Sequence, residues 1–227
     1  MQILDDIPFA LDAASLSAYL KIEPGSQDAE TLADLIQLAD QHGRPKAAYR
    51  ELYIDNASGD TVSLDGTTFA SRMLAKHLAP VERVFAFIAT CGREAHDALE
   101  PGDDMLTAFW WDVIKGKLLG AAVSHLRDHL HRRFRLGKTA SMSPGSGDAM
   151  VWPIEQQAGL FALMGDVRSA IGVELTDSFL MIPNKTLSGI LFPTEVDFGT
   201  CQVCRRDPCP SRSAPFDEKL WREIEHR

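Results

Sequence analysis

The longest run of helically spaced apolar residues extends from Asp103 to about Phe134. Side chains that recur every three or four positions share one face of a helix, and here they are Leu106, Phe109, Trp110, Val113, Ile114, Ala121, Ala122, Leu126 and Leu130. Asp103 and Asp104 supply an N-terminal cap. Such a stripe is more typical of a core-facing surface than of a cofactor site, so the pattern predicts one long central helix.

Shorter helices are predicted in the first third of the chain. Within Ile3–Leu20, either Asp12 or Ser15 can cap a short helix. A second helix is predicted over the apolar repeat Leu32–Ala39, and Thr67–Leu78 is also expected to be helical.

Five segments have the apolar, β-branched or aromatic character of strands. Ala48–Ile54 and Thr61–Leu64 are joined by a polar turn, as in a hairpin. Val84–Ala89 is continuously apolar, which predicts a strand buried on both faces. Gly172–Ile182 and Thr186–Phe192 are predicted to be strands on either side of a short turn. The predicted class is therefore α+β, with a mixed or antiparallel sheet packed against helices.

The composition of the sequence changes twice along the chain, which suggests three segments. Residues 1–135 form an N-terminal part of helices and strands, and residues 136–195 form a core that includes a glycine-rich loop. Residues 196–227 form a cysteine-rich tail that is expected to bind a metal.

Composition narrows the classes of partner. The chain has 227 residues, 45% hydrophobic and 24% charged, which is ordinary for a globular protein. A formal net charge of -9 argues against a nucleic-acid partner. The basic segment Arg127–Lys138 is better explained as complementing the negative end of the long helix than as a nucleic-acid patch. No apolar run approaches the roughly 18 residues of a membrane span, and the N-terminus lacks a basic signal region. We therefore expect a cytoplasmic protein with no membrane contact.

Three of the four cysteines fall within nine positions, in the segment CQVCRRDPCPSR. Cys201 and Cys204 form a CxxC pair, and Cys209 follows at a spacing that can supply a third thiolate to one metal centre. The fourth position could be filled by Cys91, by a His or Asp, or by a small ligand. A disulfide with an odd thiol and a redox CxxC are the alternatives, and spacing alone separates zinc from iron poorly.

No catalytic constellation is recognisable elsewhere in the sequence. There is no Ser/His/Asp arrangement, phosphate-binding loop or paired-carboxylate motif. His125 and His129 lie four residues apart on the predicted long helix, but without an HExxH-type acid they are better explained as solvated histidines. No catalytic residue is predicted.

A loop rich in Gly, Ser and Pro occupies Ser141–Gln157 and leads into a helix predicted over Leu160–Ala170. Gly145 and Gly147 allow positive φ or a close approach to a ligand, although a plain turn explains them equally well. The candidate cofactor-binding residues of this loop are Ser143, Pro144, Gly145, Ser146, Gly147 and Asp148.

Three segments of the second half resemble the activation domain of cobalamin-dependent methionine synthase. They are SPGSGD at Ser143–Asp148, WPIEQQ at Trp152–Gln157 and IGVELTDSFLMIPNKTLSGILF at Ile171–Phe192, together about a quarter of the chain. In that family a PGY loop precedes a helix and then an LTES-type strand pair that ends in an SG strand. The matching residues are Pro144, Gly145, Leu175, Thr176, Asp177, Ser178, Ser188 and Gly189.

A looser likeness extends to other parts of the chain. Arg44–Tyr53 and Phe85–Gly92 resemble stand-alone relatives of that domain from organisms with anaerobic corrinoid metabolism. The cysteine-rich tail resembles the tails of some of these relatives. It suggests that electron delivery is built into the chain.

The resemblance implies a domain that binds S-adenosylmethionine and docks on a corrinoid protein or cobalamin-dependent methyltransferase during reductive reactivation of cob(II)alamin. The chain departs from the family's RxxPGY loop, because Ser141 and Ser146 stand where the Arg and Tyr do. We expect a redox activator whose Cys201, Cys204 and Cys209 hold a [4Fe-4S] cluster rather than zinc. The alternative is a non-redox binding module with a structural zinc site that recognises a corrinoid protein or S-adenosylmethionine.

Overall fold

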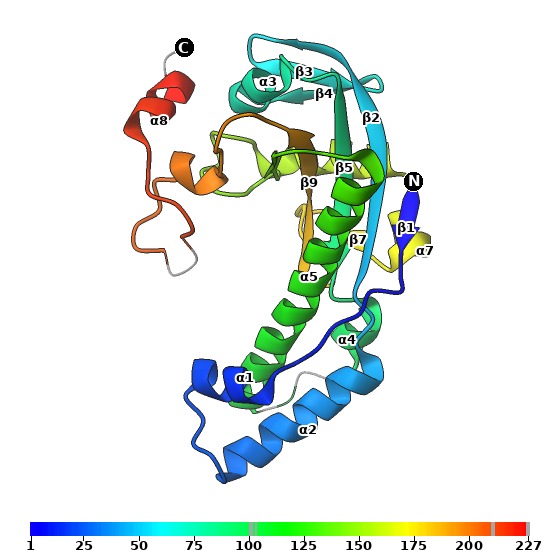
Figure 1. The fold of residues 1–227 in the computed structure, drawn as a ribbon, viewed down its shortest axis with the longest axis vertical. Coiled ribbons are helices and arrows are strands. Elements are labelled where there is room, and N and C mark those ends of the chain that lie inside the picture. The colour runs from blue at the N-terminus through cyan, green and yellow to red at the C-terminus, as the bar shows by residue number, and fades with distance from the viewer. Residues whose placement is uncertain (100–101, 103, 210–211, 226–227) are drawn as a thin grey trace.

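The structure, a computed structural model, describes residues 1–99, 102, 104–209 and 212–225. It has the predicted α+β architecture, with one antiparallel sheet, helices on both of its faces and a helical lobe at one end (Figure 1). The helix predicted from Asp103 is observed as α5, Met105–Phe134, capped by the Asp104 carboxylate. Asp103 itself lies outside the described residues.

Seven strands form the main sheet within the described residues, in the order β4-β3-β2-β5-β9-β6 with β1 paired to β2. All of these pairings are antiparallel. The strands are β1 Gln2–Leu4, β2 Lys46–Ser58, β3 Thr61–Leu64, β4 Thr67–Ala70, β5 Arg83–Thr90, β6 Thr139–Met142 and β9 Thr186–Pro193. The predicted hairpin is β2–β3, and the predicted strands Val84–Ala89 and Thr186–Phe192 lie within β5 and β9.

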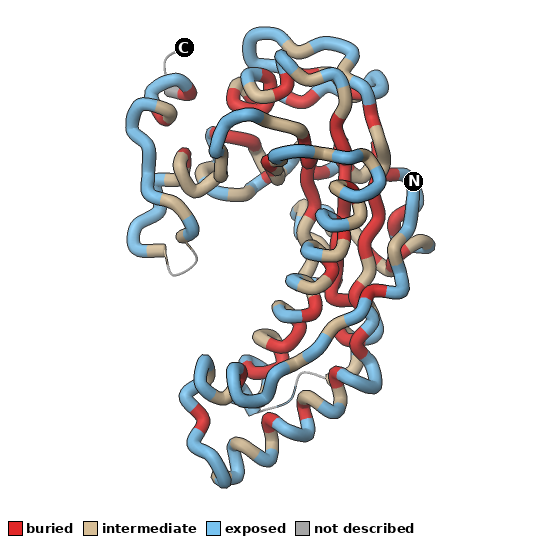
Figure 2. Tube along the Cα trace, viewed as in Figure 1, coloured by how far each residue is buried: buried red, intermediate tan, exposed pale blue. Residues whose placement is uncertain are grey.

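Strand β5 is buried on both faces, as its continuous apolar sequence predicted. Phe85 and Phe87 face the side covered by α5, whereas Val84, Ala86 and Ile88 belong to the core on the other side. Successive side chains of a strand point to opposite faces, so a strand between two helical layers needs apolar residues at every position. Figure 2 shows buried residues concentrated along the central strands and the inner face of α5.

Helix α5 joins two cores. Its C-terminal half places Ala122, Leu126 and Leu130 against the sheet. Its N-terminal half places Trp110, Ile114 and neighbouring residues in a separate cluster with α1 Ala13–Leu20, α2 Gln27–His42 and α4 Arg93–Asp97. The opposite face of the sheet is covered by α3 Arg72–Leu78, α6 Gln157–Met164 and α7 Val167–Ile171.

The remaining elements are short. Ile154–Gln156 (η1) and Thr200–Val203 (η2) are 3-10 turns, and Glu218–Glu225 is the C-terminal helix α8. Val203 of η2 and Trp221 of α8 are buried in the core below the sheet. The cysteine-rich tail is therefore packed onto the domain through these two side chains.

The prediction of one helix over Thr67–Leu78 was wrong in its first third. Thr67–Ala70 is the strand β4, which pairs with β3 and buries Phe69 beside Val62. Helix α3 begins only after Ser71, whose hydroxyl accepts a hydrogen bond from the Leu74 amide at 3.1 Å. The apolar spacing suited a helix, but β-branched Thr67 and Thr68 beside the β3 edge favour a third strand.

Gly172–Ile182 was also mispredicted as one continuous strand. It contains two short strands, β7 Glu174–Leu175 and β8 Met181–Ile182, which pair with each other in a separate two-stranded sheet. The Thr176 amide donates to the Leu180 carbonyl at 2.8 Å, and Phe179 has φ of 62°, so the chain reverses here.

The helix predicted over Leu160–Ala170 is two helices. Gly165 has φ of 82° and ends α6, and the Asp166 carboxylate then caps α7 by accepting from the Ser169 amide at 3.0 Å. Glycine tolerates this positive φ without the strain that a β-carbon introduces.

Among the described residues, no helix is long and apolar enough to cross a bilayer.

The close approach of β6 to β9 gives a stability prediction. A β-carbon on Gly189 would lie 2.4 Å from the Met142 carbonyl oxygen, so Gly189→Ala is expected to lower the free energy of unfolding by about 1–3 kcal/mol. Gly120 on α5 has open space around its β-carbon position, so the control Gly120→Ala is expected to raise stability by about 0.5–1 kcal/mol. Urea unfolding of both variants checks this, and a similar change in both would contradict the assigned register.

Candidate functional site

The glycine-rich loop Ser143–Asp148 begins where β6 ends and is held by its own backbone. The Gly145 amide donates to the Trp152 carbonyl at 2.8 Å, and the Ser146 amide donates to the Ser143 carbonyl at 3.1 Å. Gly145 and Gly147 both have positive φ, at 72° and 84°. A β-carbon on Gly145 would also lie 3.0 Å from Ile154, so both conformation and space favour glycine here.

The loop starts against β9, at the Ser188-Gly189 pair. The Ser143 hydroxyl lies 2.7 Å from the position of a β-carbon on Gly189, so glycine lets the loop approach the strand. The Ser188 hydroxyl is buried and donates to the Gln157 side chain at 3.0 Å, which in turn donates to the Phe179 carbonyl at 3.0 Å. These bonds connect the sheet, the start of α6 and the β7–β8 turn below the loop.

The loop and the cysteine-rich tail meet. Both Nε and Nη2 of Arg205 lie 3.0 Å from Oδ2 of Asp148, across 57 residues of sequence. A β-carbon on Gly147 would lie 3.1 Å from Thr200 and 3.5 Å from the β-carbon of Cys204. The two groups of candidate residues found separately in the sequence therefore lie next to each other.

Arg205 also connects the tail to the C-terminal helix. Its guanidinium carbon lies 4.2 Å from the ring centroid of Trp221, a distance suited to a cation–π contact. Asp148 further accepts from the Met150 amide at 3.1 Å. The Asp148 carboxylate is thus occupied by partners from its own loop and from the tail, and both oxygens are used.

The three tail cysteines are free thiols in the structure and partly exposed. Cys201 lies in η2 and its sulfur accepts from the Ser213 hydroxyl at 3.3 Å and the Ser213 amide at 3.5 Å. These hydrogen bonds, with the nearby Arg212 guanidinium, lower the pKa of Cys201 and favour its thiolate. A cavity of about 440 Å³ borders Cys204 and Arg212.

No group of three or more His, Cys, Asp or Glu side chains is arranged to hold a metal ion in the described part of the chain. The chemistry of the thiols suits a soft metal, because thiolate is the ligand form of cysteine and Cys201 is biased toward it. The assignment of Cys201, Cys204 and Cys209 as metal ligands stays a prediction from their spacing.

Arg212 holds the cysteine segment together. Its guanidinium donates to the carbonyl oxygens of Cys201 and Cys204, each at 3.1 Å, of Arg206 at 2.5 Å and of Ala214 at 3.4 Å. Its own amide donates to the Cys209 carbonyl at 3.2 Å. The side chain of Arg212 therefore fixes the turn that carries the CxxC pair, and its backbone amide holds the third cysteine. No pattern in the sequence indicates this role.

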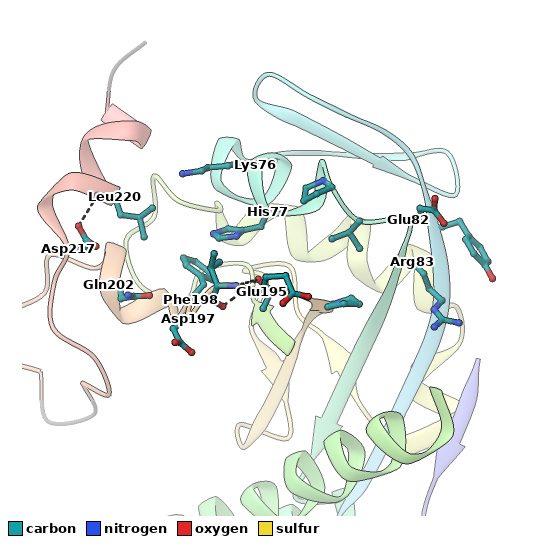
Figure 3. Close-up of a pocket in the computed structure, with 16 residues that line it drawn as sticks. Lys76, His77, Glu82, Arg83, Glu195, Asp197, Phe198, Gln202, Asp217 and Leu220 are labelled. Atoms are coloured by element: carbon teal, nitrogen blue, oxygen red, sulfur yellow. Dashed lines mark hydrogen bonds between the residues drawn. The ribbon is translucent and has the colours of Figure 1, made fainter. Parts of the chain in front are cut away.

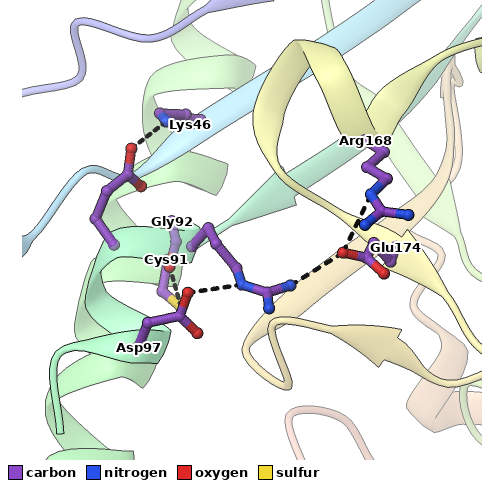
Figure 4. Close-up of polar contacts among 8 residues, drawn as sticks. Lys46, Cys91, Gly92, Asp97, Arg168 and Glu174 are labelled. Atoms are coloured by element: carbon purple, nitrogen blue, oxygen red, sulfur yellow. Dashed lines mark hydrogen bonds and ion pairs between the residues drawn. The ribbon is translucent and has the colours of Figure 1, made fainter.

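Cys91, a candidate for the fourth ligand, lies at the start of α4 beside Gly92 (Figure 4). It follows β5 next to the Thr90–Thr186 pair, whereas the tail leaves the sheet after Pro193 at the other end of β9. Seven residues of strand separate these ends, about 23 Å. Cys91 is fully buried, its thiol donates to the Gly92 carbonyl, and burial raises its pKa to about 11. Among the described residues, Cys91 belongs to no group of three possible metal ligands.

The ion pairs near Cys91 fasten secondary-structure elements to one another. Arg93 of α4 bonds Asp97 at 2.8 Å and Glu174 of β7 at 3.1 Å, and Arg168 of α7 lies 3.4 Å from Glu174 (Figure 4). Glu174 is thus an anchor between α4, α7 and β7.

The histidines near the end of α5 also have structural partners. The His129 ring lies 3.0 Å from the Tyr49 hydroxyl, and Nε2 of His131 lies 3.0 Å from the Thr139 hydroxyl. These contacts tie α5 to β2 and β6.

A large cavity was not foreseen from the sequence. It has a volume of about 950 Å³ and lies between α3, the start of β5, the segment after β9 and the tail (Figure 3). Four segments that are distant in sequence line it: Tyr53, the stretch from Lys76 to Arg83, the stretch from Pro193 to Gln202, and the pair Asp217 and Leu220. No local motif could therefore have indicated this cavity. Val81, Phe198 and Leu220 form apolar walls, and charged residues such as Lys76 and Glu195 border it.

The pKa of His77, on the wall of this cavity, is strongly lowered. Its ring centroid lies 4.0 Å from that of Phe198 and 5.8 Å from that of Phe192. Burial, with a smaller contribution from Lys76, lowers its pKa to about 4. Its Nε2 is buried and has no hydrogen-bond partner within the described residues. His77 is therefore neutral at pH 7.

Replacing Arg212 tests its role in holding the cysteine segment. Arg212→Gln removes most of the carbonyl contacts, so amide hydrogen exchange over residues 200–209 is expected to accelerate by about tenfold or more. Arg206→Gln makes the same change of charge at an exposed side chain and is expected to leave exchange unchanged. Equal acceleration in both variants, measured by mass spectrometry of peptides, would show that charge alone matters.

His77 gives a pH prediction. Its folded pKa is lowered from 6.5 to about 4, so its contribution to stability is complete above pH 6.5 and is lost as pH falls toward 4. The wild type is expected to lose more unfolding free energy than His77→Phe between pH 7 and pH 4.5, because Phe cannot be protonated. Urea unfolding at both pH values measures the difference. Parallel losses would mean that His77 titrates normally.

Comparison with known structures finds the same fold in the crystal structure of the MetH reactivation domain bound to AdoHcy. The TM-score is 0.56 with 16% sequence identity, and the match covers 88% of this chain and 80% of that chain. No protein-family model matches the sequence, and no curated protein matches it. At this identity the likeness concerns the fold, and it confirms the α+β architecture expected from the resemblance.

Proposed function

We propose that this protein is an accessory factor for corrinoid-dependent methyl transfer and takes part in the reductive reactivation of cob(II)alamin on a partner. The partner is a corrinoid protein or a cobalamin-dependent methyltransferase. The observation that carries the proposal is the contact between the Ser143–Asp148 loop and the cysteine segment through Asp148 and Arg205. It brings a candidate ligand loop and a candidate redox centre together on a fold shared with a reactivation domain.

The redox centre of the proposal is a [4Fe-4S] cluster held by Cys201, Cys204 and Cys209. Each thiolate of such a cluster binds a different iron, so the three sulfurs need not converge on one point. The lowered pKa of Cys201 favours the ligand form, and Arg212 fixes the backbone at Cys201 and Cys204. When bound, a cluster supplies one-electron transfer. The fourth position is then open or taken by a ligand other than Cys91.

The loop is proposed to contact S-adenosylmethionine or the partner's corrinoid. The neighbouring MetH domain was crystallised with AdoHcy. We assign the contact in this chain to Ser143, Pro144, Gly145, Ser146, Gly147 and Asp148, because this segment resembles the PGY loop of the activation-domain family. Ser141 and Ser146 provide neither a guanidinium nor an aromatic ring. Asp148 is engaged by Arg205, so the backbone of the loop is the main remaining source of contacts.

The metal content of anaerobically purified protein tests the proposal. The wild type is expected to contain iron and sulfide and to absorb visible light broadly, and the triple variant Cys201→Ser, Cys204→Ser, Cys209→Ser is expected to lose most of both. Cys91→Ala is the matched control and is expected to retain them, because Cys91 is buried at the opposite end of β9.

Each result has a distinct meaning. If the triple variant keeps its metal and spectrum, the tail is not the metal site. A colourless protein with zinc replaces the redox role by the alternative, a binding module that recognises a corrinoid protein or S-adenosylmethionine. The functional assay supplies an electron donor and a cob(II)alamin-loaded corrinoid protein, and follows the cobalamin spectrum with wild type and triple variant.

A further inference from the structure

The large cavity beside α3 lies apart from the loop and the cysteine segment. Neither the three tail cysteines nor any residue of Ser143–Asp148 lines it. The loop follows Met142, whereas the cavity borders Pro193, which pairs with Thr139 at the other end of β6. Its volume of about 950 Å³ is near the upper end of the range for small-molecule sites. The proposed redox role makes no use of this cavity.

Contacts within the chain hold the walls of the cavity in place. The Phe198 ring packs on the His77 ring, with 4.0 Å between their centroids. The Asp217 carboxylate accepts from the Leu220 amide at 3.0 Å, and the Asp217 amide donates to the Gln202 carbonyl at 2.8 Å. The apolar surfaces of Phe198 and Leu220 are therefore fixed by the domain and the tail together, as in a preformed ligand site.

The cations that line the cavity are neutralised by groups outside it. Lys76 pairs with Glu223, and Arg83 pairs with Glu51 at 3.1 Å, and neither of these carboxylates is in the lining. Burial lowers the pKa of His77 to about 4, so its ring adds no positive charge at pH 7. The buried Nε2 of His77 has no partner among the described residues, so hydrogen-bonding capacity in this wall is also unused.

The carboxylates of the lining are not all neutralised. Asp197 pairs with Lys138 at 2.5 Å, and Asp217 caps the helix that carries Leu220. Glu82 and Glu195 form no side-chain hydrogen bond or ion pair with any described residue. Glu82 precedes β5 and Glu195 follows β9, and because these strands pair, both residues lie at the same end of the sheet (Figure 3). Unpaired carboxylates beside apolar walls concentrate a negative potential in the cavity.

We propose that this cavity binds an organic cation, an alkyl or aryl amine, with its apolar body against Val81, Phe198 and Leu220 and its ammonium group beside Glu82 and Glu195. An ammonium group has three donors and no acceptor, which suits walls whose free charged groups are carboxylates. Attraction between opposite charges is stronger beside apolar walls than in water. The apolar walls favour an amine with an apolar body over an inorganic cation, because only the amine removes apolar surface from water. The site is independent of the proposed redox role.

Three probes that share one apolar body test the proposal on the full chain: phenylbutylamine, phenylbutanol and phenylbutyrate. Nuclear magnetic resonance titration with the amine is expected to give saturable shifts of the Val81 and Phe198 amides. The amine is expected to bind about tenfold or more tightly than the alcohol, and the acid more weakly than the alcohol. Shifts that never saturate, equal affinities of the amine and the alcohol, tighter binding of the acid, or shifts confined to Ser143–Asp148 overturn the proposal.

Variants locate the binding. Glu195→Gln keeps the size of the side chain and removes its charge, so it is expected to weaken amine binding by about fivefold or more and to leave binding of the alcohol unchanged. Glu82→Gln is expected to act in the same direction. The matched control Glu23→Gln makes the same change at an exposed side chain between α1 and α2 and is expected to change affinity by less than about twofold.

An unperturbed amide spectrum away from the cavity shows that each variant is folded. Equal weakening of amine binding by Glu195→Gln and Glu23→Gln, or no weakening by either cavity variant, overturns the assignment.

Discussion

The position of β9 between β5 and β6 is the constraint on which the candidate site depends. Pairing with β5 buries β9 in the centre of the sheet, and pairing with β6 aligns Met142 with Ile190 next to Gly189. The loop leaves the sheet directly after Met142, and the tail leaves it after Pro193 on the neighbouring strand. Because the two strands are antiparallel, Met142 pairs with Ile190 whereas Pro193 pairs with Thr139, so the loop and the tail leave from opposite ends of a four-residue ladder. The tail must therefore turn back toward the loop, and the ion pair between Asp148 and Arg205 joins the two segments there.

That ion pair also changes the electrostatics expected at the cysteine segment. Positive charge near an iron–sulfur centre raises its reduction potential, whereas reduction of a corrinoid to cob(I)alamin requires a low one. The sequence places Arg205 and Arg206 directly after Cys204. In the fold, the Asp148 carboxylate compensates Arg205, and the Arg212 guanidinium is directed to backbone carbonyls. The positive charge close to the cysteines is therefore smaller in the fold than the sequence suggests, and Arg206 is exposed to solvent.

Much of the fold could be predicted because strong periodicity reflects burial. Strand β5 and helix α5 were found from continuous and helically spaced apolar residues, and both cross the core. The errors have two causes. Thr67–Ala70 is a strand because β3 lies beside it, and Gly172–Ile182 is interrupted because a local turn reverses the chain after Thr176. The loop and tail were identified as candidates from composition and cysteine spacing. Their contact, the role of Arg212 and the cavity around His77 arise from residues distant in sequence, for which a single sequence gives no signal.

Helix α5 has a mechanical consequence for the whole molecule. Its 30 residues extend about 45 Å, and its two halves belong to different cores. The helical lobe and the sheet are thus joined by this one helix, as well as by α4, which follows β5 directly along the chain. Gly116 and Gly120 lie in the middle of α5, with open space where their side chains would be. Because glycine has a low intrinsic helix propensity, the turn between the two cores is the part of α5 whose helical conformation depends most on the packing at either end.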